Sequence, residues 1–409
     1  MHEKEFAFAD AAFAAGNLAA SEVVCRDILD EAPRHADALN LLGIIAAKVK
    51  AVEQAQRYFA AAIEADSSNQ AFQRNLELTK FTFVRKPDST PRYLVIKAWG
   101  FGFWSDISHV LGSLLLAEIT GRIPVIHLGK SSLYADDSGA DVFGRYFQPV
   151  SDLGLTDVAA IAGATFFPAK WNKANLAQDD VAKWKGAGSR LGALNFLNRR
   201  ETVAVSDFYV GAIYVQPWIP ADHPMHGKTL DEIHRYLLAK YLRLNKGCQA
   251  ECDAFFDRHL QGAPFAAVHM RGADKILEDA DVRARHEACM AELAAVDPSW
   301  RIFLLTDDAP MAERLKAQYG DRIVLTDAQR SSSIVGVHCD PAADRVKAAQ
   351  EVVVDTFLGA RADRFIGTGR SNISTLIAAM KDWLPGHCTI FGDNQIMERN
   401  LFIFTGSAD

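Results

Sequence analysis

Two patterns of apolar and polar residues divide the chain. From residue 5 to residue 83, apolar positions recur at helical spacing in a stretch that is rich in alanine and leucine and contains one proline. From residue 93 onward, short apolar runs alternate with amphipathic helical stretches, as expected for parallel strands joined by crossover helices. The sequence therefore predicts an all-α region followed by α/β structure.

The α/β part is expected to form two Rossmann-like units that face a cleft. Strands of the first unit are expected at residues 93–96, 122–127, 202–205 and 212–215. A long helical stretch at 229–259 leads to the second unit, whose strands are expected at residues 265–269, 301–305, 323–325 and 364–366. Helices are expected at residues 106–120, 284–296, 309–319, 341–362 and 371–381. A polar segment with two prolines at residues 86–92 and the long helical stretch give the predicted domains 1–86, 87–245 and 246–409.

The helical region repeats itself after 34 residues, so that Ala9 matches Gly43 and Val24 matches Tyr58. Small residues are needed where the two helices of one repeat cross closely, and larger residues fill the groove to the next repeat. The pattern resembles two tetratricopeptide (TPR) repeats with a following helix, and a generic pair of helical hairpins is the alternative. Because independent stability usually needs roughly three repeats, we expect this TPR-like region to lean on the domain behind it.

Composition and charge narrow the classes of function. With 49% hydrophobic and 23% charged residues the chain is an ordinary globular protein, and its net charge of −7 argues against a general nucleic-acid surface. Residues 1–10 lack the pattern of a signal peptide, and no apolar run approaches the roughly 18 to 20 residues that cross a bilayer. We therefore predict a cytoplasmic protein.

The six cysteines are scattered and only Cys248 and Cys252 lie close together, so reduced, buried thiols are expected rather than zinc ligands.

A cluster of polar residues, 269–275, directly follows a predicted buried strand. Ligands of parallel α/β sheets bind beyond the carboxyl ends of strands, so a site is expected here. Arg271, held by a turn that contains Gly272, has the planar fork that binds phosphate oxygens. The alternative is an ion pair between Arg271 and Asp274 at the strand end.

A second cluster combines Asp355 with residues 363–375, which run from a predicted strand into a helix. Glycines and hydroxyl groups at a helix N-terminus offer free N–H groups and a positive dipole to an anion. Ser371 and Asn372 lie at the expected start of this helix. The alternative is an ordinary helix cap without a ligand.

A third cluster, residues 99–112, lies at the first strand-to-helix turn. Its glycines Gly100 and Gly102 lack the third glycine of a dinucleotide-binding fingerprint. His109 lies one turn into the helix, where it either faces the cleft or is a buried capping histidine. Taken alone, this segment does not specify a ligand.

Together these segments resemble a superfamily of fucosyltransferases that includes the nodulation and core α-1,6-fucosyltransferases and the protein O-fucosyltransferases. The core enzyme has an H-x-R-R-x-D-K motif, which residues 269–275 match with Gly272 in place of the second arginine. The O-fucosyltransferases have a glycine-rich loop before an Asp-His and Leu-Gly helix, which is similar to residues 100–112. Their late motif, Ala-Asp-x-Phe-Ile-Gly and a serine-rich turn after an aspartate and an apolar helix, is similar to residues 355–371. Residues 305–308 match their Ala-Thr-Asp-Asp strand end, and the resemblance covers about residues 93–382.

This resemblance implies a GT-B fold and an inverting, metal-independent glycosyltransferase. It implies transfer of a sugar, fucose by default, from a GDP-sugar to a hydroxyl group of a protein or glycan acceptor, with no cofactor. Arg271 and Ser371 would bind the β-phosphate of the donor, and His269 and Asp355 would contact its nucleoside. The expected donor-binding residues are His269, Arg271, Asp274, Asp355, Ser371, Asn372, Gly100 and Gly102. The expected catalytic residues are Arg271, Lys275, Asp279 and His109, and Lys275 together with Asp279 or Glu278 are the candidates for deprotonating the acceptor.

Alternatives to this interpretation stay open. Asp279 and Asp281 form a D-x-D of the kind that holds Mn²⁺ in other glycosyltransferases, but they lie in a polar stretch rather than at the end of a buried strand. His223 and His226 have the spacing of metal ligands but lack an apparent third ligand. A different class of function is a TPR adaptor whose transferase-like part is catalytically silent. Gly272 keeps this alternative open, because it replaces an arginine of the motif. The repeats themselves suggest an extended polypeptide acceptor or a homodimer.

Overall fold

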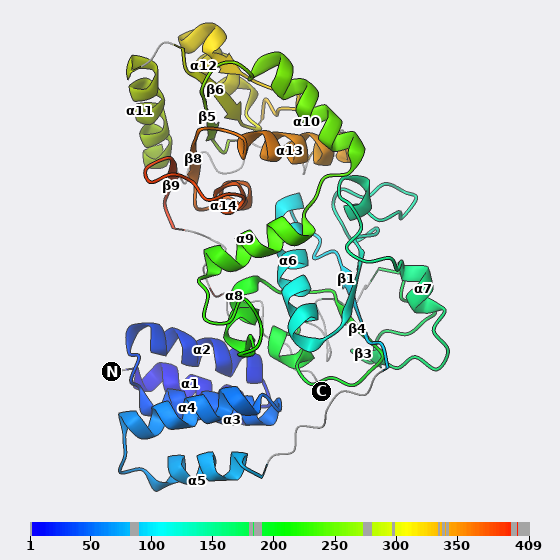
Figure 1. Ribbon diagram of the computed structural model, residues 1–409, viewed down its shortest axis with the longest axis vertical. Coiled ribbons are helices and arrows are strands. Elements are labelled where there is room, and N and C mark those ends of the chain that lie inside the picture. Colours follow the sequence, from blue (N-terminus) through cyan, green and yellow to red (C-terminus); the bar gives the residue numbers. More distant parts are fainter. Residues whose placement is uncertain are drawn as a thin grey trace.

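The computed structural model describes residues 2–81, 90–179, 183, 190–272, 280–296, 299–333, 336–337, 340, 343–393 and 399. In Figure 1 an all-helical region, a first sheet with its helices and a second sheet with its helices follow one another along the long axis of the molecule. The expected site residues Asp274, Lys275 and Asp279 lie outside the described residues, as does the predicted boundary at residue 86.

The helical region matches the 34-residue spacing of the sequence. Its helices are α1 (Glu3–Ala14), α2 (Leu18–Glu31), α3 (Ala36–Lys48), α4 (Val52–Ala65) and α5 (Gln70–Thr79). The starts of α2 and α4 are 34 residues apart (52 minus 18), and so are the starts of α3 and α5 (70 minus 36). A Cβ atom added to Gly43 would lie 2.5 Å from the ring of Phe59, so the small residue expected at this helix crossing is required there.

The first sheet is parallel and has the strand order β2-β1-β4-β3. Its strands are β1 (Tyr93–Lys97), β2 (Ile123–His127), β3 (Phe166–Phe167) and β4 (Val203–Ser206). The helices of this unit are α6 (Phe103–Thr120), α7 (Leu155–Ala159), α8 (Ala212–Val215) and α9 (Leu230–Tyr241), with 3₁₀ turns at Phe143–Arg145, Ala193–Phe196 and Gln216–Trp218.

The strand expected at residues 212–215 is wrong, because these residues form the short helix α8. All four side chains are buried, and periodicity cannot distinguish so short an apolar run in a strand from one in a buried helix. The segment just before α8 packs directly on α6, where a Cβ atom on Gly112 would lie 2.0 Å from the carbonyl oxygen of Val210. Helix α8 therefore covers α6 instead of extending the sheet.

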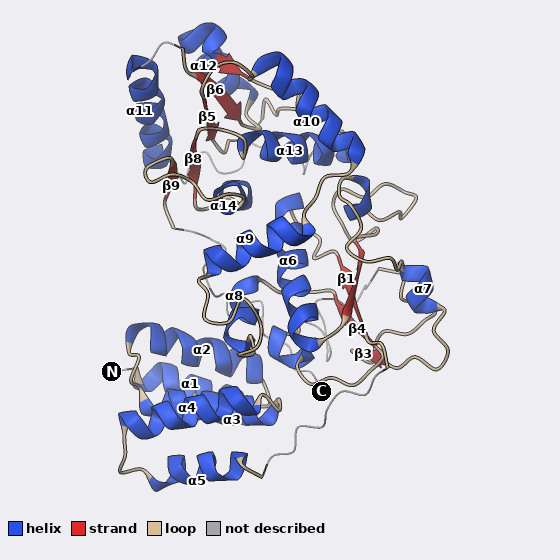
Figure 2. Cartoon of the chain, in the orientation of Figure 1, coloured by secondary structure: helices blue, strands red, loops and turns tan. Residues whose placement is uncertain are grey.

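The second sheet is also parallel and has the strand order β7-β6-β5-β8-β9. Its strands are β5 (Phe265–His269), β6 (Arg301–Leu305), β7 (Ile323–Val324), β8 (Arg364–Thr368) and β9 (Cys388–Phe391). Its helices are α10 (Lys246–His259), α11 (Ala280–Val296), α12 (Ala309–Tyr319), α13 (Arg345–Gly359) and α14 (Asn372–Ala379), with a 3₁₀ turn at Gly320–Arg322. Figure 2 shows helices packed on both sheets. The break between the two sheets falls between α9 and α10.

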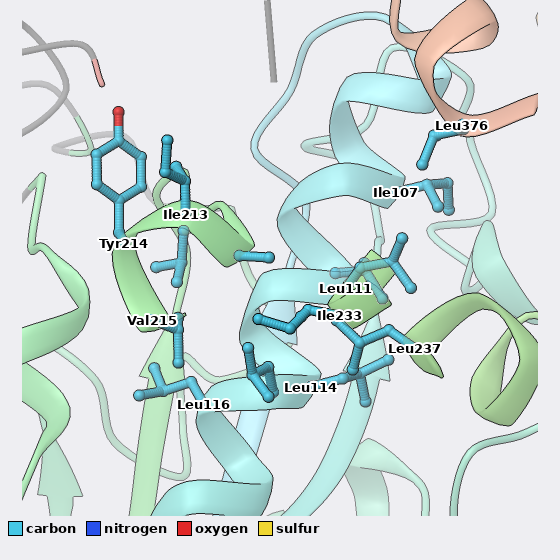
Figure 3. Close-up of a cluster of buried hydrophobic side chains, with 14 of the residues drawn as sticks. Ile107, Leu111, Leu114, Leu116, Ile213, Tyr214, Val215, Ile233, Leu237 and Leu376 are labelled. Atoms are coloured by element: carbon cyan, nitrogen blue, oxygen red, sulfur yellow. The ribbon is translucent and has the colours of Figure 1, made fainter. Parts of the chain in front are cut away.

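Helix α6 joins the parts of the molecule. Its buried residues surround the helix on all sides, as in a helix enclosed by other elements. Figure 3 shows Ile107 of α6 beside Leu376 of α14, and Leu111 and Leu114 of α6 near Ile233 and Leu237 of α9. One continuous apolar core extends from the helical region through α6 to the second sheet. The two sheet-bearing units are thus packed directly against each other.

The helical region is anchored to the first α/β unit through an arginine whose side chain is only 10% exposed. The guanidinium of Arg26 lies 2.7 Å from a carboxylate oxygen of Glu22, donates to the hydroxyl of Tyr58 at 2.6 Å and lies 5.3 Å from the ring of Trp218. Gln54 also donates to the carbonyl oxygen of Trp218, at 3.3 Å. These contacts provide the support expected for so short a helical array. The chain returns to the same region near its end, where Arg399 pairs with Asp27 and Asp30 of α2.

Candidate functional site

A pocket of about 360 Å³ lies between the two α/β units, at the carboxyl ends of their first strands. Residues 101–105 and Tyr134 of the first unit line it, and residues that follow β5, β6 and β8 line it from the second unit. In the second sheet, β6 and β8 flank β5 on opposite sides, so the order in which successive strands are added to the sheet reverses between β5 and β8. Ligands of open α/β sheets bind in the crevice at such a switch point.

Arg271 lines the pocket just beyond the end of β5. Its Nη1 donates to the carbonyl oxygen of Arg370, in the loop after β8, at 3.3 Å. The guanidinium therefore lies across the gap between the two central strands. A permanent positive charge is thus placed at the switch point.

Gly272 is fixed by the loop that follows β6. Its N–H donates to Oδ1 of Asp307 at 3.1 Å, and a Cβ atom at this position would lie 2.2 Å from the Cβ of Asp308. Asp308 has little room to move, because it is buried and its Oδ1 caps α12 by accepting the N–H of Met311 at 2.8 Å. The glycine in place of a second arginine is therefore a packing requirement of this chain.

His269, the last residue of β5, lines the pocket from a buried position. Its Nδ1 lies 2.7 Å from the hydroxyl oxygen of Ser374. Burial, with a further contribution from the charge of Arg271, lowers the pKa of His269 to about 3. The imidazole is therefore neutral at physiological pH.

The N-terminus of α14 opens into the same pocket. Ser371 is its N-cap residue by position, is buried and makes no side-chain capping bond to the helix. Ser371, Asn372 and Ile373 all line the pocket. The first N–H groups of a helix have no partners within the helix and carry a partial positive charge. This end of the pocket is therefore suited to an anion.

Asp355 supplies a carboxylate at another part of the pocket. It lies on α13, it is buried, and its Oδ1 accepts a hydrogen bond from the hydroxyl of Thr326 at 2.6 Å. Burial raises the pKa of Asp355 to about 6, although the bond from Thr326 and the charge of Arg330 act in the opposite direction. Glu351, one turn earlier on α13, lines the pocket beside it.

The first unit contributes its glycine-rich loop to the pocket. Gly100 has a φ of +94°, its N–H donates to Oδ1 of Asp106 at 2.8 Å, and it is not a lining residue. Gly102 is the N-cap residue of α6 and lines the pocket. The Nζ of Lys183 holds the loop further by donating to the carbonyl oxygens of Ala98 and Trp99. Gly100 thus shapes the loop, whereas Gly102 places the N-terminus of α6 at the pocket.

His109 does not reach the pocket, which corrects the expectation of a catalytic residue. It is completely buried, its Nε2 lies 3.1 Å from the carbonyl oxygen of Lys97, and its Nδ1 accepts the N–H of Val210 at 3.0 Å. Burial, assisted by the charge of Lys183, lowers the pKa of His109 to about 3. Both ring nitrogens are used to join β1, α6 and the loop before α8, so this histidine has the structural position that was the alternative.

Some pocket residues were not singled out from the sequence. They include Tyr134, Gln329 and Glu351, whereas Thr306 and Asp307 lie in the predicted strand end 305–308, and Phe101, Phe103, Trp104 and Ser105 lie in the predicted cluster 99–112. The position of Glu351 could have been predicted, because it precedes Asp355 by four residues on one predicted helix and therefore lies on the same face. Tyr134 and Gln329 lie in irregular loops, for which periodicity gives no orientation.

The potential metal ligands have other partners. His223 Nε2 lies 2.8 Å from Oε2 of Glu118, and His226 Nδ1 lies 2.8 Å from the carbonyl oxygen of Ile219. Asp281 lies in the first turn of α11, 3.9 Å from Arg285. Within the described ranges, no group of three His, Cys, Asp or Glu side chains is arranged to hold a metal ion. The cysteines in these ranges are free thiols, and Cys248 and Cys252 are buried as expected.

The structure thus has the GT-B arrangement, in which two Rossmann-like units face a pocket, preceded by an all-α region. Among the described helices, none is long and apolar enough to span a membrane. No protein-family model matches the chain, and no curated protein sequence matches it.

Solved structures of fucosyltransferases have a similar fold. The fucosyltransferase NodZ from Bradyrhizobium is 20% identical, with 71% of this chain and 93% of NodZ covered and a TM-score of 0.48. POFUT1 in complex with GDP-fucose is 13% identical over 75% of this chain and 99% of its own, with a TM-score of 0.48. A variant of FUT1 from Arabidopsis thaliana in complex with GDP is 11% identical over 80% of this chain and 75% of its own, with a TM-score of 0.48.

Proposed function

We propose that this protein is a glycosyltransferase that binds a GDP-sugar in the pocket between its two α/β units. The observation that carries the proposal is the convergence of Arg271, Ser371 and the N-terminus of α14 at the switch point of the second sheet. The proposed reaction transfers the sugar, fucose by default, to a hydroxyl group of a protein or glycan acceptor with inversion. Fucose is chosen from the resemblance of the sequence motifs.

The anion-binding end of the pocket suits the diphosphate of such a donor. Negative charge develops on the β-phosphate as the glycosidic bond breaks, and fixed positive groups at that position stabilise the transition state. Arg271 offers a charged fork, the hydroxyl of Ser371 offers a hydrogen bond, and the first turn of α14 offers N–H groups. In this proposal Arg271 has the role that a metal ion has in other glycosyltransferases, so the reaction needs no metal.

The remaining polar groups suit the nucleoside. Asp355 accepts hydrogen bonds, as required for the N–H groups of guanine, and His269 presents a ring N–H or ring nitrogen at Nε2. Asn372 and Gly102 lie close enough to line the donor pocket, and Gly100 contributes through the shape of its loop. Asp274 is a further proposed donor-binding residue. Lys275 and Asp279 remain the proposed groups for deprotonating the acceptor.

The acceptor and the setting of the protein stay predictions of the sequence. An extended polypeptide bound by the TPR-like helices is the acceptor that we favour, because stacked repeats form concave surfaces. Location in the cytoplasm and assembly into a homodimer are likewise predictions.

The test is thermal stabilisation of the purified protein by GDP, UDP, CMP and NAD, each with and without Mn²⁺. A ligand that binds the folded state at 100 times its Kd adds about 2.7 kcal/mol to its stability. We expect GDP to stabilise the wild type without metal and to have little effect on Arg271→Ala. Arg258→Ala, which removes an exposed arginine of α10, is the matched control and should respond like the wild type.

The outcomes separate the classes of function. A response to UDP or CMP instead of GDP would retain a nucleotide-sugar transferase and reject the proposed donor. A requirement for Mn²⁺ would reject metal independence. No response to any nucleotide would reject the transferase in favour of the catalytically silent adaptor. After a response to GDP, GDP-sugars are tested as donors.

A further inference from the structure

Ser374 lies beneath the pocket and links three of its elements. It is completely buried in the first turn of α14 and is not a lining residue. Its Oγ accepts the N–H of Thr368, at the end of β8, at 3.0 Å and lies 2.7 Å from Nδ1 of His269, at the end of β5. One hydroxyl group therefore connects both central strands to the helix whose N-terminus opens into the pocket.

The donors and acceptors of this chain determine where the protons lie. A backbone N–H can only donate, so Ser374 Oγ accepts from Thr368. Among the described residues, Nδ1 of His269 is the only other hydrogen-bond partner of this buried oxygen, so it is the only acceptor for the hydroxyl proton, which therefore points to Nδ1. Nδ1 then accepts, and the single proton of the neutral imidazole is on Nε2. That nitrogen is on the ring edge turned to the pocket, because the Nδ1 edge is bonded to a buried residue.

We propose that Ser374 is a positioning residue that fixes the tautomer of His269, so that the pocket offers an N–H donor rather than a lone pair to an oxygen atom of the bound nucleotide. The naming of a nucleotide rests on the proposed function, whereas the tautomer itself does not. A donor at this position complements an oxygen-rich ligand, in which phosphate and sugar oxygens accept hydrogen bonds. The low pKa of His269, about 3, keeps this donor neutral across the physiological range.

The packing around Gly367 is separate evidence that the Ser374 hydroxyl has a fixed position. A Cβ atom added at Gly367 would lie 2.5 Å from Oγ of Ser374. Gly367 is the next-to-last residue of β8 and is buried, and a glycine weakens a strand unless another group approaches closely. The glycine therefore leaves the space that the Ser374 hydroxyl occupies between the two strands.

The inference is tested first without a ligand, by ¹⁵N–¹H correlation spectra of the histidine rings, which distinguish the two neutral tautomers. His269→Gln identifies the His269 signals. We expect the Nε2-protonated form in the wild type and in Ser374→Thr, which keeps the hydroxyl, and a mixture of tautomers in Ser374→Ala. Thr375→Ala is the matched control, since it removes a neighbouring buried hydroxyl whose hydrogen bonds within the described residues go to carbonyl oxygens of α14 and its N-cap residue.

Affinity for GDP is the second measurement. Ser374→Ala should weaken binding about tenfold, the effect of losing one well-oriented hydrogen bond, and Thr375→Ala should not. In His269→Ala, the additional change Ser374→Ala should have no further effect, because Ser374 acts through the imidazole. Melting temperatures of all variants show whether each one folds.

Three results would overturn the inference: an unchanged tautomer in Ser374→Ala, equal losses of affinity in Ser374→Ala and Thr375→Ala, or additive losses in the double variant. If wild-type protein fails to bind GDP, the proposed function fails. The spectra of the ligand-free protein still decide the role of Ser374 in that case, so the two failures are distinguishable.

Discussion

Gly272 packs so closely on Asp308 that a Cβ atom added to the glycine would lie 2.2 Å from the Cβ of Asp308. The H-x-R-R-x-D-K motif has its second arginine at the position of Gly272. In this protein the backbone at that position packs directly against Asp308 instead. Because the N–H of Gly272 also bonds to Asp307, the loops after β5 and β6 are joined at this point. This junction holds the backbone next to Arg271, the preceding residue, whose side chain lines the pocket.

The first prediction concerns this contact. Gly272→Ala must displace the loop that contains Asp308 or the loop that contains Arg271, and we expect a loss of stability of about 1–3 kcal/mol, typical of overpacking. The same displacement should remove most of the stabilisation by GDP. Urea denaturation and GDP titration of the purified variant measure the two effects.

A matched glycine tests whether the effect is local. A Cβ atom on Gly247, in the first turn of α10, would approach Asn245 no closer than 3.4 Å. Gly247→Ala should therefore retain GDP binding and be neutral or more stable by up to about 1 kcal/mol. If Gly272→Ala and Gly272→Arg bind GDP like the wild type, the junction does not position Arg271.

The second prediction concerns the buried carboxylate of Asp355. Asp355→Asn keeps an oxygen that accepts from Thr326 but removes a buried charge, so it should increase stability and weaken GDP binding by about tenfold or more. Chemical denaturation measures the gain in stability, and GDP titration measures the loss of affinity, both at pH 7.5. A variant that binds GDP normally would show that the carboxylate does not contact the base.

The pH dependence of this stability gain follows from the raised pKa. The carboxyl group has a pKa of about 6 in the folded protein and 3.8 as the ordinary value, so the folded state holds the proton more tightly. Wild-type protein therefore loses stability relative to Asp355→Asn as the pH rises from about 3 to 7, by about 3 kcal/mol in all, and the difference is constant above about pH 7. Comparing variant with wild type cancels the contribution of Asp106, whose pKa burial also raises to about 6.

Much of the fold could be predicted because apolar runs bounded by polar turns specify buried parallel strands. The expected strand at 265–269 coincides with β5, and the expected helix at 309–319 coincides with α12. The run at 212–215 failed because four buried apolar residues fit a helix as well as a strand. Strand β9 was missed, since its residues are only half-buried at the edge of the sheet.

The site was predictable where residues follow a strand directly. His269, Arg271 and Ser371 are brought to one pocket because the carboxyl ends of parallel strands share an edge of the sheet. The contact between Gly272 and Asp308 was not predictable, since it depends on the approach of two loops that are 36 residues apart (308 minus 272). The position of His109 within a helix likewise did not reveal that both of its ring nitrogens bond to the backbone.

The third prediction separates a structural role of His109 from a catalytic one. His109→Ala leaves the carbonyl oxygen of Lys97 and the N–H of Val210 without their partner, which should lower the stability by about 2–4 kcal/mol. The protein that stays folded should bind GDP with unchanged affinity and have unchanged specific activity. His259→Ala, on the exposed end of α10, should change the stability by less than about 0.5 kcal/mol. A loss of activity in stable, folded His109→Ala protein would show that His109 takes part in the reaction.

The fourth prediction concerns the attachment of the helical region. Arg26→Ala leaves the carboxylate of Glu22 buried without its charged partner and removes the guanidinium between the rings of Tyr58 and Trp218. Breaking a buried ion pair in this way typically costs about 3–5 kcal/mol. Because burial already raises the pKa of Glu22, this carboxyl group should then take up a proton more readily. We expect the helices α1–α5 to unfold at a lower urea concentration than the rest of the chain, with faster hydrogen exchange in α2.

An exposed ion pair in the same region provides the control. Lys80 and Glu77 are 2.5 Å apart, and their side chains are 57% and 60% exposed, so Lys80→Ala should change the stability by less than about 1 kcal/mol. GDP binding should persist in Arg26→Ala, because every described residue that lines the pocket belongs to one of the two α/β units. If Arg26→Ala and Lys80→Ala unfold alike in a single transition, Arg26 does not anchor the helical region. If Arg26→Ala also abolishes GDP binding, the helical region supports the pocket as well as leaning on the first α/β unit.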